Sequence, residues 1–203
     1  MSLRTLTVVL ASTLVGIVAT PVGAQDAPPN PRMLVETSEG DFEIELFKDQ
    51  VPATVVNFLT YVQAGYYDGT IFHRVIRDLI VQGGGYVDDG NGAIVPKLEG
   101  LRGRILNEAP NGPRNRQGTI AMARGTEPNS ARQQFFINLD NNLNFNHKNR
   151  TAQGFGYAVF GRVTDGMDVV RRIGRTPTTT RDIGENVPRE TIVIWSITQI
   201  EAN

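Results

Sequence analysis

From Met33 to the C-terminus the sequence consists mainly of short apolar runs separated by glycine-rich or polar segments, a pattern typical of β-strands and turns. Within one run Phe42, Ile44 and Leu46 alternate with glutamates, which predicts a strand with one buried face. The strand-like runs lie at 33–37, 41–47, 70–85 (a hairpin), 118–124, 132–139, 156–163 and 190–200, and one further short strand is expected at Gly103–Leu106.

Two segments have helical rather than strand periodicity. The segment 52–65 has Pro52 near its start and Gly65 as a stop signal, and the segment 164–174 has Asp165 as a candidate N-cap. About eight strands, two helices and no long-range repeat predict an all-β fold with two helices. The strands are expected to form a closed antiparallel barrel, because a closed barrel leaves no strand edge unpaired.

Composition narrows the possible chemistry. The chain of 203 residues is long enough for one domain with a sizeable core, and its formal net charge of −1 does not favour nucleic acid or anionic lipid as a partner. With no cysteine and two histidines, disulfides and thiol chemistry are excluded, and a metal site would have to rest mainly on carboxylates. Asp88 and Asp89 stand beside Gly90 and are typical of a polar loop, so no metal is expected.

The N-terminal segment has the build of a secretory signal. Arg4 precedes an apolar stretch that runs from Leu6 to about Ala19, and small residues follow at 22–24. An uncleaved membrane anchor is the alternative, but Pro21 interrupts the helix, and the strongly apolar part is shorter than the roughly 20 residues that span a bilayer. We expect residues 1–24 to be a signal removed on export to the periplasm, residues 25–32 to be a proline-rich linker, and residues 33–203 to be the domain.

The stretch Thr70–Gly85 places an arginine and a glutamine among apolar side chains. A three-residue turn at 77–79 pairs Arg74 with Gln82 on one face, whereas a two-residue turn sends them to different faces. The first register predicts an inner face of Ile71, His73, Val75 and Val81 and an outer face of Phe72, Arg74, Ile76, Ile80 and Gln82. Considered by itself, Arg74 could instead have a purely structural role, in which its aliphatic stem covers an apolar surface.

Further fragments follow the hairpin in a fixed order. FHRVI and VQGGG precede GTIAMARGTEPNSARQQFFIN and GYAVFGRV. In order and spacing these fragments resemble the cyclophilin family of peptidyl-prolyl cis-trans isomerases, and the secreted bacterial members in particular, from roughly Met33 to the C-terminus. The resemblance implies a closed eight-stranded antiparallel barrel capped by two helices, an isomerase acting on X–Pro bonds, and a role in the folding of exported proteins.

The resemblance also implies the site residues. The arginine of FHR is Arg74 and the glutamine of QGG is Gln82, which form the catalytic pair, and the second phenylalanine of QFF is Phe136, which lies in the proline pocket. Ala123 and Arg124 contribute to substrate binding, and Arg124 stands where many members have asparagine. Because that position is used through its backbone, the change is expected to matter little. Tyr157 occupies a further substrate-binding position, where other members have histidine.

Two parts of the site depart from the family pattern. The family's Pro-Gly-Phe-Met corresponds to residues 77–80, so Leu79 and Ile80 keep the pocket wall apolar but remove an aromatic ring. In NLDNNLNFNHK either Leu143 or Phe145 supplies the part of the pocket wall that the family builds from tryptophan or phenylalanine. No tryptophan is available for this position, because the only one, Trp195, lies in the final strand. We therefore expect cyclosporin-type cyclic peptides to bind weakly.

The residue types suit a reaction without metal or cofactor. Rotation about an X–Pro bond crosses a barrier of ~20 kcal/mol because the twisted amide loses conjugation. A dry socket for the proline ring would be formed by Phe136, Ile80 and either Leu143 or Phe145. Arg74 would donate a hydrogen bond to the prolyl nitrogen, and Gln82 would hold the Arg74 guanidinium in place. Proline-containing polypeptides are the expected partners of a monomer.

Two other functions fit the same barrel. A non-catalytic proline-binding chaperone module would be favoured if Arg74 or Phe136 were replaced, and both are present. A small-ligand transport barrel would need an open interior, whereas the inward positions are bulky and apolar. Of the remaining candidates, His73 is expected to be a buried structural histidine, His147 a solvated loop residue, and Phe135 a core residue.

Overall fold

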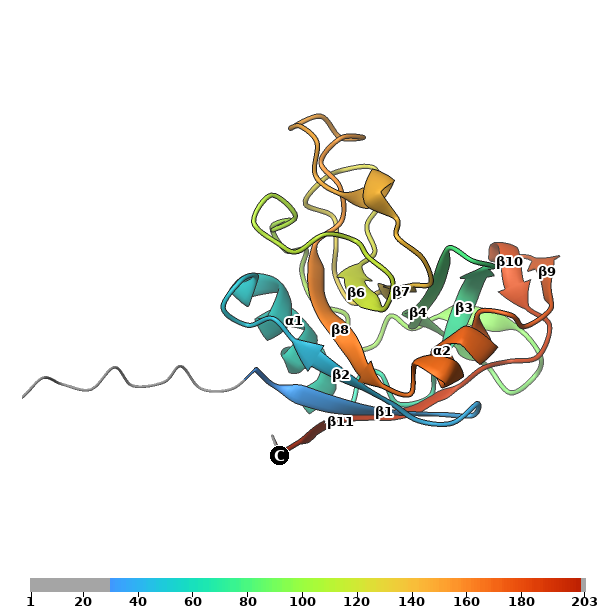
Figure 1. Ribbon diagram of the computed structural model, residues 1–203. Coiled ribbons are helices and arrows are strands. Elements are labelled where there is room, and N and C mark those ends of the chain that lie inside the picture. The colour runs from blue at the N-terminus through green and yellow to red at the C-terminus, as the bar shows by residue number, and fades with distance from the viewer. Residues whose placement is uncertain (1–29, 202–203) are drawn as a thin grey trace, which may run out of the picture.

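The computed structural model describes residues 30–201 as a curled antiparallel sheet with two helices (Figure 1). The strands are β1 Arg32–Thr37, β2 Phe42–Leu46, β3 Thr70–Ile76, β4 Ile80–Asp88, β5 Ile94–Pro96, β6 Thr119–Met122, β7 Phe135–Asn138, β8 Val159–Asp165, β9 Thr178–Arg181, β10 Gly184–Pro188 and β11 Ile194–Ile200. The helices are α1 Pro52–Gln63, α2 Met167–Ile173 and the 3₁₀ turn η1 Leu143–Phe145. The predicted signal segment 1–24 and most of the predicted linker lie outside the described residues.

The sheet follows one path of eight strands in the order β11-β1-β2-β8-β6-β7-β4-β3, with β5 paired to β4 and β9–β10 forming a separate hairpin. Its two end strands approach each other through an isolated bridge between Ile71 and Val193. Phe72 N–H also donates to Ile192 O at 2.9 Å. The predicted class, mainly β with two helices, is confirmed, and β3 and β11 meet through a short bridge instead of a continuous ladder.

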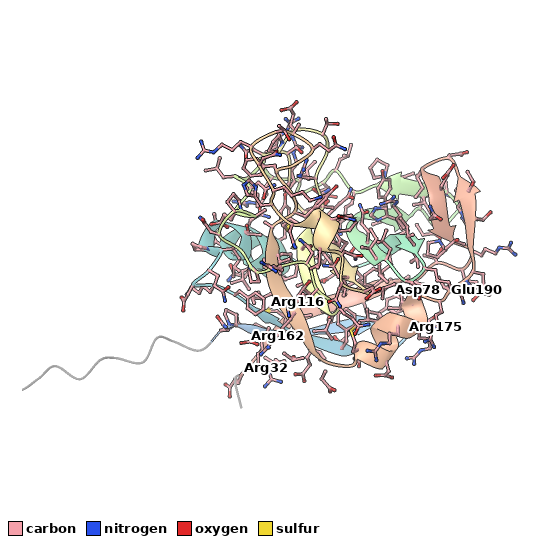
Figure 2. The ribbon with its side chains drawn as sticks, turned by 45° about the horizontal axis from the view of Figure 1, so that its top comes forward. Arg32, Asp78, Arg116, Arg162, Arg175 and Glu190 are labelled. Carbon is pink, nitrogen blue, oxygen red and sulfur yellow. The ribbon has the colours of Figure 1, made fainter. Side chains whose placement is uncertain are left out.

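The β1–β2 hairpin forms because its alternating sequence has one apolar and one charged face. The apolar residues of β2 are buried in the core, while Glu43 and Glu45 face outward. Arg32 on β1 forms an ion pair with Glu43, and Arg162 on β8 donates to Glu45 Oε2 at 2.9 Å. Both arginines are labelled in Figure 2. A hydrogen bond from the side chain of Asn30 and the charge of Arg162 lower the pKa of Glu45. These cross-strand contacts hold the register of neighbouring strands.

Both helices were predicted at the observed positions, but one cap was not. The prediction of Asp165 as the N-cap of α2 is wrong, because β8 continues to Asp165 and pairs it with Glu43. The cap is Gly166, whose φ of 73° lies in the left-handed region that glycine adopts without strain. A Cβ there would lie 2.6 Å from Asp41 O. Within residues 30–201, neither helix is long and apolar enough to cross a membrane.

Aromatic side chains fill the inside of the curled sheet. Phe58 of α1 packs with its ring centroid 5.2 Å from Tyr67, 5.9 Å from Phe135 and 5.0 Å from Phe160. All four side chains are almost completely buried. This packing leaves the interior occupied by side chains, which does not fit a transport barrel with an open lumen.

Three short elements differ from the sequence prediction. The strand expected at Gly103–Leu106 is wrong: this segment is a loop in which Ile105 N–H donates to Ala131 O, and no strand pairs with it. Strand β5 and the β9–β10 hairpin were not predicted. Their sequences are short and lack a sustained alternation of apolar residues, so pairing with neighbours decides their conformation.

The predicted pairing of β3 with β4 is confirmed, because Arg74 lies opposite Gln82, Val75 opposite Val81 and Ile76 opposite Ile80. The predicted faces of the earlier residues are wrong. Phe72 belongs to the main core with Val75, while Ile71 packs in a separate cluster with Ile94 and Val187. The register shifts on both sides of Phe72, and such a bulge reverses the alternation for the residues that precede it.

The final strand contains a second irregularity. Thr37 lies opposite Ile194 while Glu36 lies opposite Ser196, so one residue of β11 is extra. As a result Ile197 joins Ile194 in the core, whereas strict alternation along the strand would have placed Ser196 on the face of Ile194.

Candidate active site

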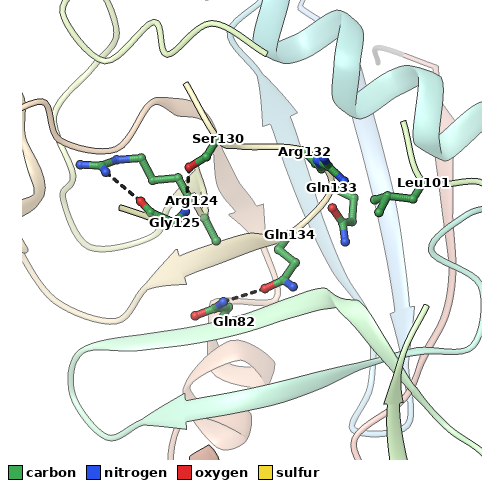
Figure 3. Close-up of a pocket in the computed structure, with 9 residues that line it drawn as sticks. Gln82, Leu101, Arg124, Gly125, Ser130, Arg132, Gln133 and Gln134 are labelled. Carbon is green, nitrogen blue, oxygen red and sulfur yellow. Dashed lines mark hydrogen bonds between the residues drawn. The ribbon is translucent and has the colours of Figure 1, made fainter. Parts of the chain in front are cut away.

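The β3–β4 hairpin presents a chain of polar side chains. The exposed Arg74 donates from Nη1 to Gln82 Oε1 at 3.4 Å. Gln82 Nε2 in turn donates to Gln134 Oε1 at 2.9 Å (Figure 3). Asp78, with φ of 56°, closes the three-residue turn that sets this register. Gln134 was not predicted as a site residue, although it lies two residues before Phe136 and strand alternation places both on one face.

The glycine run after Gln82 provides the space in which Gln134 lies. A Cβ on Gly85 would lie 2.4 Å from Gln134 Nε2 and 2.5 Å from its Cγ, so any larger residue displaces that side chain. A Cβ on Gly84, where φ is 80°, would lie 2.8 Å from the Tyr67 ring. The glycines therefore let a core ring and a site glutamine pack directly on the backbone of β4.

An apolar cluster lies beside the polar chain. On the paired strands β4 and β7, Gln82 is directly opposite Phe136. The Phe136 ring packs edge-on against Phe145 at 5.8 Å and against Tyr157 at 5.5 Å. The cluster has a buried floor of Ile80, Ala121, Phe136 and Val159, and its partly buried rim includes Ile76, Leu79, Ala123, Phe145 and Tyr157. The structure thus brings most of the sequence-predicted binding residues together next to Arg74 and Gln82.

The two alternatives for the remaining wall are placed differently. Phe145 belongs to the cluster, whereas Leu143 is 50% exposed and lies outside it. Asn142 Nδ2, just before the 3₁₀ turn η1, donates to Leu79 O at 2.9 Å and to Asn138 Oδ1 at 2.8 Å. This buried asparagine ties η1 to the β3–β4 turn and was not identified from the sequence.

Arg124 makes contacts beside the site with its side chain and not only with its backbone. Its guanidinium donates to backbone carbonyls on two loops and lies over the Tyr157 ring, 4.8 Å from its centroid. The expectation that an arginine here matters little therefore overlooked these contacts. Figure 3 shows the guanidinium turned away from Gln82 and Gln134.

Neither histidine belongs to the Phe136 cluster or to the polar chain of Arg74, Gln82 and Gln134. His73 is 6% exposed, packs on Tyr86 at 4.5 Å, and has no hydrogen-bond partner for Nδ1 among residues 30–201. Burial lowers the pKa of His73 to about 4, which fits the predicted structural role. The prediction of a solvated His147 is wrong in part, since this residue is half-buried and its Nδ1 lies 2.9 Å from Phe155 O.

Two cavities flank Arg124. One of ≈ 340 Å³ lies beside Gln82, and one of ≈ 630 Å³ lies beside Tyr157. The first is lined by Gln82, Leu101, Ala123, Arg124, Gly125, Ser130, Arg132, Gln133 and Gln134 (Figure 3).

Across the described part of the chain no three His, Asp or Glu side chains are grouped to hold a metal ion. Asp89 Oδ1 instead accepts the N–H groups of Asn91 and Ala93 in a turn.

A curled antiparallel sheet with a guanidinium–amide pair beside an aromatic socket defines a class of barrel suited to binding proline next to a hydrogen-bond donor. Residues 32–199 match the family model described as cyclophilin type peptidyl-prolyl cis-trans isomerase/CLD. The chain therefore belongs to the cyclophilin-type peptidyl-prolyl cis-trans isomerase family, and it is an enzyme of that class.

Bacterial relatives cover most of the chain. A peptidyl-prolyl cis-trans isomerase of Streptomyces antibioticus is 47% identical over 162 residues, which are 80% of this chain and 94% of the relative. Peptidyl-prolyl cis-trans isomerase B of Escherichia coli is 44% identical over 165 residues, which are 81% of this chain and 97% of the relative.

Solved structures agree with the fold. A cyclophilin type peptidyl-prolyl cis-trans isomerase of Cryptosporidium parvum, crystallised in the presence of the dipeptide Ala-Pro, has a TM-score of 0.65 and 29% sequence identity. The similarity covers 85% of this chain and 99% of that one.

Proposed function

We propose that this enzyme rotates X–Pro bonds in polypeptides exported from the cytoplasm and so assists their folding, with Arg74 and Gln82 as the catalytic pair. The observation that carries the proposal is the polar chain from Arg74 through Gln82 to Gln134, which lies against the Phe136 cluster across paired strands. The Ala-Pro dipeptide present with the Cryptosporidium parvum relative supports proline-containing polypeptides as the substrate class.

The chemistry follows from loss of amide conjugation. As the X–Pro bond twists, the prolyl nitrogen becomes pyramidal, and its lone pair, no longer delocalised into the carbonyl group, can accept a hydrogen bond. Arg74 donates to that lone pair, and this interaction is stronger in the transition state than in the ground state. Gln82 orients the guanidinium through Oε1, while Gln134 holds the Gln82 amide in one orientation. The Phe136 cluster binds the proline ring away from water. No metal or cofactor takes part in these steps.

Catalysis and simple proline binding are separated by a rate measurement. The chain beginning at Gln25 is mixed with a peptide containing one X–Pro bond, and isomerisation is followed against the uncatalysed exchange, which takes tens of seconds or longer. Acceleration that saturates with peptide is expected. Peptide binding without acceleration would instead identify a non-catalytic proline-binding module.

The export part of the proposal rests on the N-terminal sequence. Arg4 followed by an apolar stretch and small residues up to Ala24 is typical of a cleaved secretory signal. Terminal sequencing of the protein from its native host should find Gln25 at the N-terminus of a soluble monomer in the periplasm. Met1 on membrane-bound protein would contradict cleavage and favour an anchor.

Cyclosporin-type cyclic peptides should bind this enzyme weakly. Phe145 stands in the socket and has no indole N–H donor, and Leu79 is an aliphatic member of the rim. A lost buried hydrogen bond and a lost ring contact each cost about 1–3 kcal/mol, so affinity should be at least about tenfold lower than in members with tryptophan there. Calorimetry on both proteins side by side tests this, and equal affinities would contradict it.

A further inference from the structure

The side chain of Arg124 connects two loops that are far apart in the sequence. Its Nε donates to Gly156 O at 2.8 Å and its Nη2 to Ala152 O at 2.9 Å. Its Nη1 donates to Gly125 O at 3.0 Å and to Thr126 O at 3.1 Å. One guanidinium thus joins the loop after β6 to the loop before β8 through four carbonyl groups.

The same guanidinium fixes a ring of the socket. It covers one face of Tyr157 with its carbon 4.8 Å from the ring centroid. The Tyr157 ring also packs edge-on against Phe136 at 5.5 Å and lies 5.2 Å from Phe145. Tyr157 is therefore held between a cation and two rings, and its position depends on Arg124.

The backbone around Tyr157 is held on its other side. Tyr157 N–H donates to Phe145 O at 2.9 Å. Gly156, with φ of 79°, packs so closely that a Cβ would lie 2.6 Å from His147 N. The Gly156 carbonyl thus accepts from Arg124 while its Cα packs against residues 145–147, so two segments restrain the backbone next to Tyr157.

Arg124 has no carboxylate partner within residues 30–201, so no ion pair accounts for its position. The carbonyl dipoles and the Tyr157 ring are what the guanidinium binds. The half-buried Arg124 also lines both of the cavities described above, one beside Gln82 and one beside Tyr157. These contacts match the fork of a guanidinium and not the single ammonium of lysine.

Resting on the proposed isomerase function, we propose that the Arg124 side chain is a positioning residue: it fixes Tyr157 and the 152–156 loop as one wall of the substrate groove. That wall contacts the polypeptide whether the X–Pro bond is planar or twisted. It therefore contributes equally to ground-state and transition-state binding, and its loss raises KM with kcat unchanged.

The test compares variants by separate kcat and KM values at a temperature well below unfolding. Arg124→Ala should raise KM by about tenfold and change kcat by less than about twofold. Arg124→Lys should recover little of the loss, since it keeps the charge but not the fork. In a Tyr157→Ala background, Arg124→Ala should raise KM by no more than about twofold, because the two residues act through one wall.

Arg150→Ala is the matched control, since it removes the same charge from an exposed position in the loop before β8, to which the Arg124 guanidinium donates. Its KM should be unchanged. The inference is overturned if Arg124→Ala keeps the wild-type KM, if its loss falls on kcat, or if Arg124→Lys restores the wild-type KM. Should Arg124→Ala fail to fold, the Lys variant and Arg124→Gln decide by the same KM readout. An inactive wild-type enzyme would count against the proposed function, whereas an active one with an unaffected variant counts only against the role of Arg124.

Discussion

Two adjacent phenylalanines on β7 lie in two different regions of the molecule. Phe135 points into the sealed core, where it meets Phe58 and Tyr67 edge-on at 5.9 and 5.6 Å. Phe136 points to the opposite face, where its neighbours Phe145 and Tyr157 are only partly buried. Both phenylalanines are almost completely buried, so exposure alone does not distinguish their roles.

The difference lies in what surrounds each ring. The core around Phe135 is enclosed by the sheet and α1, and its aromatic packing supplies stability. The Phe136 cluster has an open rim and lies across the ladder from Gln82, so a proline ring can meet apolar side chains and a hydrogen-bond donor at one place. One strand therefore serves folding with one face and recognition with the other.

The largest expected effect separates the two rings. Phe135→Ala should lower the free energy of unfolding by about 3–5 kcal/mol, because the enclosed core leaves a cavity. Phe136→Ala should cost less, since Phe145 and Tyr157 at the rim can move into the space, but it should abolish most of the isomerase activity. Urea unfolding of both variants measures the difference, and equal losses of stability would remove the distinction between the regions.

The buried His73, unlike the exposed Arg74 next to it, should make the free energy of unfolding depend on pH. Burial holds the pKa of His73 near 4 in the folded chain, against 6.5 for the free group, so the unfolded chain binds the extra proton between these values. Stability should therefore fall as the pH drops from 6.5 to about 4, by about 3 kcal/mol, and not change further through this group below that range. His73→Phe should lose this component of the pH dependence. An identical profile for the variant would show that His73 is not protected by burial.

Arg74→Ala should reduce kcat/KM by about 100-fold or more, which corresponds to at least ~2.7 kcal/mol of transition-state stabilisation. Because Arg74 is exposed, its removal should change stability by only about 0.5–1 kcal/mol. Arg74→Lys should recover little activity, since an ammonium does not reproduce the fork held by Gln82. A variant that isomerises normally, or one that is inactive because it is unfolded, would leave Arg74 as a stem that covers an apolar face.

The smallest effect concerns the support behind the catalytic pair. Gly85→Ala should displace Gln134 and so release Gln82, lowering kcat/KM by roughly tenfold. Gln134→Ala should lose a similar amount, and the double variant should lose no more than either single one, because both act on the same contact. Gly103→Ala is the control, because Gly103 lies in an exposed loop, has no positive φ, and no atom lies within 4 Å of the Cβ that alanine adds. Additive losses would contradict a shared contact.

Much of the hairpin was predictable because a turn of three residues fixes the pairing of Arg74 with Gln82. The alternation at Phe135 and Phe136 was likewise predictable, since successive residues of a strand face opposite ways. The bulge at Phe72 was not, because it depends on how Phe72 lies opposite Gly83 and near Ile192 in distant segments. The extra residue in β11 escaped prediction for the same reason.

The sequence alone determined most of the long strands, both helices and the family resemblance. It also determined the pairing of Arg74 with Gln82 and the opposite faces of Phe135 and Phe136, because turn length and strand alternation are local properties of the chain. Only the tertiary structure decided that Phe145 and not Leu143 joins the socket, and that Arg124 holds the loop of Tyr157. The physical reason is that these contacts join segments separated by tens of residues along the chain. Such segments meet only after the sheet has curled, and no local pattern records which side chains then touch.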